Sequence, residues 1–177
     1  MRIRRARPED ADAIAAVHVR SWKAAFPGLL PQDYLDALRP EDRLGQWQEA
    51  LSSPPWPVVL VGEEGGHVVG FVAVAPSGDP DAGDDVGEVQ TVYVDPGAWG
   101  SGHGARLLEA GLAELERAGF ARATLWVLHS NERARRFYER HGWAADGATK
   151  EHDWVAFTAT DVRYGRALDQ PSQDSAS

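Results

Sequence analysis

Cysteine is absent from this 177-residue chain, and methionine occurs once. Without cysteine there can be no disulfide bond, no thiol nucleophile and no thiolate metal site. Apolar runs long enough to cross a bilayer are also absent, and Met1 to Arg5 lead into patterned sequence instead of the apolar core of a signal peptide. These absences predict a cytoplasmic protein that does not associate with a membrane.

Positive charge is scarce, because 18 Lys and Arg residues stand against 27 Asp and Glu residues, for a formal net charge of −9. Nucleic-acid binding requires a basic face, so this balance argues against a nucleic-acid partner. An acidic surface around a cleft would attract a cationic substrate such as an amine, although an acidic composition more often serves solubility.

Two kinds of catalytic motif are missing as well. No Gly-x-Ser-x-Gly or comparable nucleophile turn occurs, which argues against a covalent enzyme intermediate. Five of the six histidines show no ligand spacing with a carboxylate partner, and we therefore expect no metal site. These histidines are His18, His67, His103, His141 and His152.

The length and the hydrophobic content of 43% are those of one globular domain with a full core. We expect this domain to span residues 1–168. The polar tail over residues 169–177 is expected to be disordered. The amphipathic helices would also allow a homodimer.

The most informative stretch is a strand, a glycine-rich turn and a helix in immediate succession. β-branched and aromatic residues predict a buried strand over residues 86–94, and helical spacing of apolar residues predicts a helix over residues 104–118. The turn between them contains Gly100, Gly102 and Gly104. Unpartnered amides at the helix start favour an oxyanion such as a pyrophosphate, whereas an ordinary strand-to-helix connection is the alternative interpretation.

Two motifs give the chain a resemblance to a known family. The first is Trp99-Gly100-Ser101-Gly102-His103-Gly104, and the second runs from Asn131 to Tyr138 and is followed by Gly142-Trp143. In this order and at this distance they resemble the Gln/Arg-x-x-Gly-x-Gly/Ala and Asn-x-x-Ala-x-x-Phe-Tyr…Gly-Phe motifs of the GNAT N-acetyltransferases, over roughly residues 1–166. Trp99 departs from the family, which usually has Gln or Arg at that position.

The resemblance implies an α/β (α+β) GNAT fold. Its central sheet is mixed and mostly antiparallel, has six to seven strands, is splayed between strands 4 and 5, and is flanked by about four helices. The other predicted elements are a strand over residues 2–7, helices over 8–26 and within 32–51, a hairpin over 58–74, a strand over 123–128, a helix capped by the hydroxyl of Ser130, and strands over 143–148 and 155–164 separated by the polar residues 150–153.

The resemblance also implies acetyl-CoA as the acyl donor. The amides from Gly100 to Ala105 would bind its pyrophosphate, and the main chain of Val92 to Val94 would bind the pantetheine arm as an added strand would. An amide there can stabilise the oxyanion that develops on the thioester carbonyl. The predicted donor-binding residues are Val92, Tyr93, Val94, Gly100, Ser101, Gly102, His103, Gly104, Ala105, Asn131 and Tyr138.

Tyr138 is the predicted proton donor. Asn131 and Tyr138 are seven residues apart and therefore share a helix face, so both can meet one ligand. The resemblance implies that Asn131 contacts coenzyme A and that the Tyr138 hydroxyl protonates the leaving sulfur. The alternative is a structural aromatic residue that packs beside Phe137.

Glu88 is the predicted base. In an ideal strand it shares one side with Gln90, Val92 and Val94, from which it could accept the amine proton directly or through water. The alternative is a salt-bridged carboxylate at the strand end. His129 is the second candidate for the base, although a lone histidine at a strand end is more often structural.

The predicted acceptor contacts are Trp22, Phe26, Glu88, Gln90 and His129. In the family, the region of Trp22 and Phe26 tends to line the acceptor side of the cleft, although such aromatic residues are more often core. The expected reaction is direct acetyl transfer to a primary amine of a small molecule or a peptide. A non-catalytic acyl-CoA-binding module and an acyltransferase that uses a longer acyl chain are the alternatives.

One further departure bears on the acceptor. The ribosomal-protein-modifying branch of the family has a glutamate five residues before the equivalent of Asn131, and here this position is Trp126. The departure argues against the substrate and the mechanism of that branch.

Overall fold

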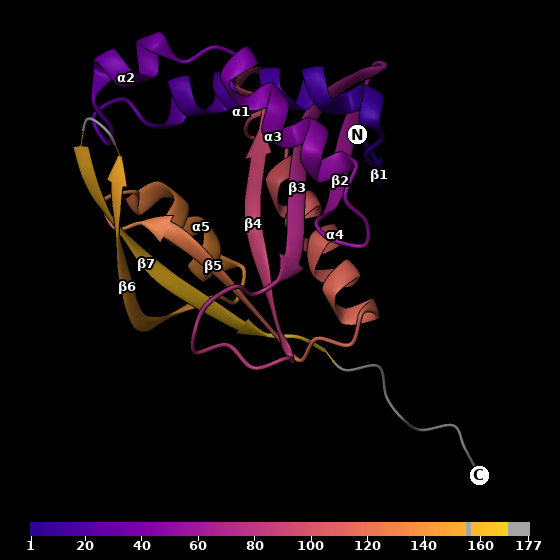
Figure 1. Cartoon of the computed structure of the whole chain (residues 1–177), viewed down its shortest axis with the longest axis vertical. Coiled ribbons are helices and arrows are strands. Elements are labelled where there is room, and N and C mark those ends of the chain that lie inside the picture. Colours follow the sequence, from indigo (N-terminus) through magenta and orange to yellow (C-terminus); the bar gives the residue numbers. More distant parts are fainter. Residues whose placement is uncertain (155–156, 170–177) are drawn as a thin grey trace.

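The computed structural model describes residues 1–154 and 157–169, and within them seven strands form one sheet flanked by five α-helices (Figure 1). The strands are β1 (Arg2–Arg5), β2 (Val58–Glu64), β3 (His67–Pro76), β4 (Val86–Val94), β5 (Arg122–Leu128), β6 (Ala144–Trp154) and β7 (Phe157–Ala167). The helices are α1 (Ala11–Ala25), α2 (Gln32–Ala37), α3 (Glu41–Leu51), α4 (His103–Arg117) and α5 (Glu132–Arg140). From residue 170 onward, the tail for which we expect disorder lies outside the described residues.

The sheet is mixed and has the strand order β1-β2-β3-β4-β5-β7-β6. Neighbouring strands are antiparallel except β4 and β5, which are parallel. These two strands pair only over Val86–Glu88 and Arg122–Thr124, and beyond this short ladder they diverge (Figure 1). The predicted mixed, mostly antiparallel sheet with a splay between strands 4 and 5 is therefore confirmed.

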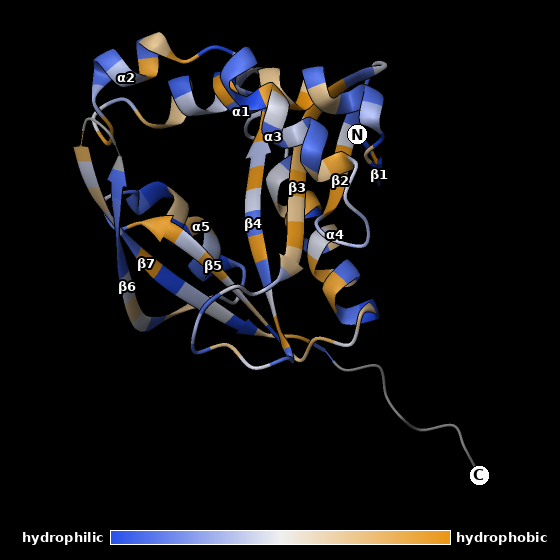
Figure 2. Ribbon diagram, in the orientation of Figure 1, coloured by the Kyte–Doolittle hydropathy of each residue, from blue (hydrophilic) through white to orange (hydrophobic). Residues whose placement is uncertain are grey.

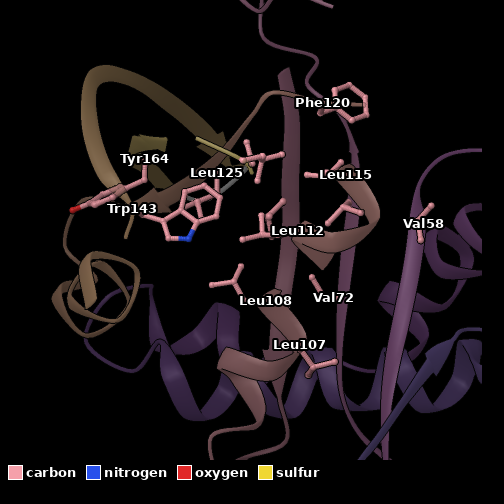
Figure 3. Close-up of a cluster of buried hydrophobic side chains, with 14 of the residues drawn as sticks. Val58, Val72, Leu107, Leu108, Leu112, Leu115, Phe120, Leu125, Trp143 and Tyr164 are labelled. Carbon is pink, nitrogen blue, oxygen red and sulfur yellow. The ribbon is translucent and has the colours of Figure 1, made fainter. Parts of the chain in front are cut away.

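Helices cover both faces of the sheet. α1 and α3 pack through Ile14 and Trp47 on the face that carries Phe71 of β3. α4 packs on the opposite face, where its leucines meet Val72 of β3 and Leu125 of β5 in the larger core (Figure 3). The apolar strands β2, β3 and β4 are thus enclosed, while the helices turn hydrophilic residues outward (Figure 2).

A bulge at Gln90 interrupts the regular alternation of β4. Val89 lies opposite Val74 of β3, and Thr91 lies opposite the adjacent residue Ala73. Gln90 is therefore an extra residue between two paired ones.

The bulge separates side chains that an ideal strand would place on one side. Val89, Val92 and Val94 pack with the core beneath α4, whereas Tyr93 packs with the core beneath α1. Since Glu88 directly precedes Val89, its side chain lies on the Tyr93 face. The prediction that Glu88 shares one side with Val92 and Val94 is wrong, because the extra residue inverts the alternation beyond it.

The final hairpin also differs from the prediction. Residues 150–153, expected to separate two strands, belong to β6 and pair with residues 158–161 of β7. β6 is an edge strand and is largely hydrophilic (Figure 2). Charged side chains are tolerated on an edge strand, where they discourage pairing with other chains, so the polar run does not end the strand.

Candidate active site

A cavity of about 960 Å³ opens where β4 and β5 diverge, a size typical of small-molecule sites. Three groups of residues line it. The glycine wall comes from β4, the start of α4 and α5: Val92, Tyr93, Val94, Trp99, Gly100, Gly102, His103, Gly104, Ala105, Asn131, Arg133, Tyr138 and Arg140. The aromatic wall comes from α1, the segment after it and α3: His18, Ser21, Trp22, Ala25, Phe26, Leu30, Arg43 and Gln46. The carboxylate wall comes from β4 to β7: Glu88, Trp126, Lys150, His152 and Asp161.

The start of α4 offers backbone amides to the cavity. Gly100 and Gly102 have φ angles of +79° and +73°, a conformation that favours glycine. Gly102 is the N-cap residue, and no side chain caps the helix. The first amides of α4 therefore keep their hydrogen-bonding capacity for a ligand, and the helix dipole favours an anion there. All the predicted turn residues line the cavity except Ser101.

The His103 ring is already paired with a carboxylate of the chain. Its Nε2 atom lies 3.0 Å from a carboxylate oxygen of Glu64, and the side chain is buried. His103 can therefore serve a ligand at the helix start through its backbone amide.

The splay leaves one edge of β4 without a neighbouring strand from Val89 onward. The end of this edge is already in use, because the Val94 carbonyl accepts hydrogen bonds from Ser21 Oγ at 3.0 Å and from Trp99 Nε1 at 2.8 Å. The main chain of Val94 is therefore only partly available for the predicted added-strand contact. Trp99, the departure from the family motif, thus ties the turn to the end of β4.

Asn131 caps α5, since its Oδ1 accepts a hydrogen bond from the Ala134 amide at 3.1 Å. The prediction that Ser130 caps this helix is wrong, because the helix begins one residue later, at Glu132, and places Asn131 at the cap. The side-chain amide nitrogen of Asn131 remains a donor for a ligand, and Asn131 lines the cavity.

The glycine wall also contains two arginines that the sequence analysis did not predict as site residues. Arg133 lies with its guanidinium 4.4 Å from the centre of the Trp99 ring, and Arg140 also lines the cavity. Arg133 lies inside the second motif and Arg140 two residues after Tyr138, so their positive charge next to a predicted site for an anionic ligand was the signal that could have identified them. Arg133 adds positive charge beside the turn before α4, and Arg140 adds positive charge to the same cavity.

Tyr138 lies on the cavity side of α5, with its ring 5.3 Å from Phe137 and 6.2 Å from Trp143. Burial raises the pKa of its phenol, because the phenolate would lose solvation. The hydroxyl makes no hydrogen bond to any residue that the structure describes. Tyr138 therefore presents a protonated phenol that is available to a ligand.

Glu88 is half-buried and lines the cavity. Burial raises the pKa of its carboxyl group, and the nearby charge of Asp79 raises it further. Within residues 1–154 and 157–169 the Glu88 carboxylate has no ion-pair partner, which counts against the salt-bridged alternative. A carboxyl group with a raised pKa is a stronger base once it is ionised.

A cluster of ion pairs centred on Arg163, which we call the clamp, includes Asp79, whose charge acts on Glu88. Arg163 of β7 forms ion pairs with Asp79 at 3.1 Å, Asp81 at 2.6 Å and Asp146 at 2.7 Å. Asp79 also accepts a hydrogen bond from the Trp126 indole at 3.1 Å. The clamp connects the loop between β3 and β4, which carries Asp79, to the hairpin of β6 and β7.

The predicted acceptor residues are placed unequally. Trp22 and Phe26 line the cavity, and their rings lie 5.0 Å apart, although Phe26 is also part of a buried cluster. Gln90 lines the cavity at the bulge. His129 is exposed and does not line the cavity, so the structure does not bring it to the other site residues.

The cavity also includes four further ionisable residues that were not predicted to be site residues: Arg43, Lys150, His152 and Asp161. The Lys150 ammonium lies 4.2 Å from the Trp126 ring, and His152 Nε2 lies 3.0 Å from an Asp161 carboxylate oxygen. Burial raises the pKa of Asp161. Lys150 and His152 reach the cavity because β6 continues through the polar run and pairs with β7, which carries Asp161.

Residues 1–154 and 157–169 contain no group of three His, Asp or Glu side chains arranged to hold a metal ion. In the same part of the chain, each helix is too short or too polar to span a membrane.

Comparison with known proteins identifies the family. Residues 18–143 match the family model described as "Acetyltransferase (GNAT) family". The uncharacterized N-acetyltransferase YuaI of Bacillus subtilis is 32% identical over 129 residues, which cover 73% of this chain and 72% of that protein. The structure of the ribosomal-protein-alanine N-acetyltransferase from Brucella melitensis superposes with a TM-score of 0.73 at 23% identity, over 95% of this chain and 100% of that one. The PaiA N-acetyltransferase from Thermoplasma acidophilum in complex with coenzyme A superposes with a TM-score of 0.72 at 18% identity, over 94% and 98% of the two chains. The chain therefore belongs to the GNAT family of acetyltransferases, the family that its two sequence motifs resemble.

Proposed function

We propose that this protein is an acetyl-CoA-dependent N-acetyltransferase that transfers the acetyl group directly to a primary amine of a small molecule or a peptide. One observation carries the proposal: the uncapped first turn of α4 and the Tyr138 phenol line the same cavity. The helix start can bind the pyrophosphate of coenzyme A, and the protonated phenol can give a proton to its sulfur when the thioester is cleaved.

The glycine wall fits the acyl donor. The amides of Gly102 to Ala105 would hold the pyrophosphate, and Arg133 and Arg140 add positive charge for the phosphates. The unpaired edge of β4 from Val89 to Tyr93 would bind the pantetheine arm through the main chain. The backbone N–H groups of this edge would stabilise negative charge on the thioester carbonyl oxygen.

The donor supplies an activated acetyl group, and the chain supplies proton management around it. Glu88 accepts a proton from the acceptor amine, directly or through water, as the new carbon–nitrogen bond forms. Tyr138 donates its proton to the sulfur as the carbon–sulfur bond breaks. The raised pKa of Tyr138 keeps the phenol protonated until that step.

The relatives support this proposal. The Thermoplasma structure with the same fold was determined in complex with coenzyme A. The Bacillus relative carries the name N-acetyltransferase.

The test is an assay of free thiol release from acetyl-CoA across a panel of primary amines, with coenzyme A binding measured separately by calorimetry. We expect release above background hydrolysis with at least one amine, and a matching acetylated product by mass spectrometry. Binding of coenzyme A without release for any amine would instead identify an acyl-CoA-binding module.

A further inference from the structure

The aromatic wall carries one charge. Of its eight residues, seven are apolar, hydroxylated, amide-bearing or neutral imidazole side chains, and Arg43 alone is ionised. A guanidinium held beside apolar surface is stabilised by a counter-anion or by several hydrogen bonds. The surroundings of Arg43 therefore show which kind of partner it lacks.

Arg43 is held in place without an anion. Its guanidinium carbon lies 5.2 Å from the centre of the Trp22 ring, and its Nη2 donates a hydrogen bond to the Tyr34 hydroxyl at 3.1 Å. Among the residues that the structure describes, no carboxylate pairs with it. The stacked, planar guanidinium thus keeps most of its donors for a ligand in the cavity.

His18 does not share this role, because it is neutral. Its Nδ1 accepts a hydrogen bond from the Trp47 indole at 3.1 Å, and the side chain is only 4% exposed. Burial, and next the charge of Arg43, lower the pKa of His18 to about 3. His18 stacks on Tyr93 with 5.2 Å between ring centres, so it forms a neutral aromatic support beside the guanidinium.

The carboxylate wall carries the complementary charge. Glu88 and Asp161 line it together with Lys150 and His152, and His152 Nε2 lies 3.0 Å from an Asp161 carboxylate oxygen. Glu88 has no such partner. Arg43, Glu88 and Asp161 all line the same cavity, where the charges of Arg43 and Asp161 both act on the Tyr93 phenol.

We infer that the acceptor is a small amino carboxylic acid, whose amine lies at Glu88 and whose carboxylate binds the Arg43 guanidinium. A guanidinium matches a carboxylate through two parallel N–H···O bonds, which an uncharged group cannot reproduce. The inference rests on the proposed function and adds the chemical class of its acceptor.

The test compares acceptors that differ only in the carboxylate. Amino carboxylic acids of different chain lengths are assayed beside their amides and their decarboxylated amines, at saturating acetyl-CoA. For the preferred acid we expect kcat/KM to exceed that of its decarboxylated partner about tenfold to a hundredfold, since hydrogen bonds to charged groups have this strength.

Arg43→Gln should remove this preference by raising KM for the acid with little change in kcat. The preference is a ratio within one variant, so a partial loss of folded enzyme cancels. Arg117→Gln is the matched control, because Arg117 is exposed, pairs with Glu114 at 2.8 Å and lies outside the cavity. It should keep the wild-type ratio.

Two results would overturn the inference alone: amines without a carboxylate are acetylated as well as the acids, or Arg43→Gln keeps the preference. If no amine of either kind is acetylated, the proposed function fails and the inference fails with it.

Discussion

The glycine wall and the aromatic wall of the cavity are built on different principles. The glycine wall presents backbone groups, from the first turn of α4 and the unpaired edge of β4. The aromatic wall presents side chains, with one guanidinium among rings. A backbone surface can persist when individual side chains change, which is why Trp99 can replace the usual Gln or Arg without loss of the uncapped helix start. Side chains in the aromatic wall have no such tolerance, and in the proposed function they are the groups that contact the acceptor.

Tyr138 belongs to the glycine wall, but in the proposed mechanism it acts through its side chain. Removal of its hydroxyl should therefore have the largest effect on turnover. Tyr138→Phe removes the proton for the leaving thiolate, so we expect kcat to fall about a hundredfold to ten-thousandfold. The Kd for acetyl-CoA, measured by calorimetry, should stay within about twofold, since the amides that bind it are unchanged.

Phe137→Leu is the control for Tyr138→Phe, because Phe137 is the neighbouring aromatic residue and carries no proton to donate. It should cost stability but leave kcat within about threefold of wild type. If Tyr138→Phe retained full kcat, Tyr138 would be a structural aromatic residue.

Glu88 tests the carboxylate side of the comparison. Glu88→Gln should lower kcat/KM roughly a hundredfold, because no carboxylate then accepts the amine proton. In the wild type the base works only when ionised, so activity should fall as the pH falls through the raised pKa of Glu88. This acidic limb should be absent from the pH profile of the variant.

The stability of Glu88→Gln should move in the opposite direction. A carboxyl group whose pKa is raised in the folded state favours folding below its unfolded pKa, and this contribution is lost as the pH rises through the folded pKa. At pH 7 the ionised Glu88 therefore costs stability that a neutral Gln does not. Urea denaturation should give Glu88→Gln a free energy of unfolding at least equal to that of the wild type, and a large loss would mean that Glu88 is structural.

The same contrast explains what the sequence could predict. Most of the glycine wall comes from two short segments, Trp99 to Ala105 and Asn131 to Tyr138, whose internal spacing fixes their geometry within one turn or one helix. Local patterns therefore predicted the wall and, through the family motifs, the splay of the sheet. Even there the predicted cap of α5, Ser130, was wrong, and Asn131 is the cap. Both residue types serve as caps, so the position of the first helical residue decides between them.

The other walls depend on contacts between distant segments. Arg43, Trp126 and Asp161 meet around one cavity only after the sheet and its helices have packed. The bulge at Gln90 has no local signal, because nothing in β4 marks one residue as unpaired, and it reversed the expected direction of Glu88 relative to Val92. Long-range pairing, which a single sequence does not specify, accounts for these misses.

Gly102 tests whether the helix start binds the donor through its backbone. Gly102→Ala places a Cβ at φ +73°, where it meets no neighbouring atom within 4 Å, so the cost is conformational and about 1 to 2 kcal/mol. Relief of this strain shifts the first amides of α4, and we expect KM for acetyl-CoA to rise about tenfold.

Gly119→Ala provides the matched control at the other end of α4. Gly119 also has a positive φ angle, +92°, and open space around it. Its substitution should lower the free energy of unfolding by a similar amount without changing KM for acetyl-CoA. An equal rise in KM for both variants would show that the effect comes from stability and not from the helix start.

The smallest expected effect on turnover comes from substitution of Arg163, which influences the pKa of Glu88, the proposed base, through its ion pair with Asp79. Arg163→Gln leaves Asp79 without its cation, so the negative charge of Asp79 raises the pKa of Glu88 further. A base with a higher pKa needs a higher pH to be ionised, and the acidic limb should therefore move to higher pH, while kcat on the plateau stays within about threefold. Arg166→Gln, on the same strand, breaks an ion pair with Glu109 that lies outside the clamp and should leave the limb in place. A limb that stays fixed in Arg163→Gln would mean that either Glu88 is not the base or Asp79 does not act on it, and the Glu88→Gln profile decides between these two explanations.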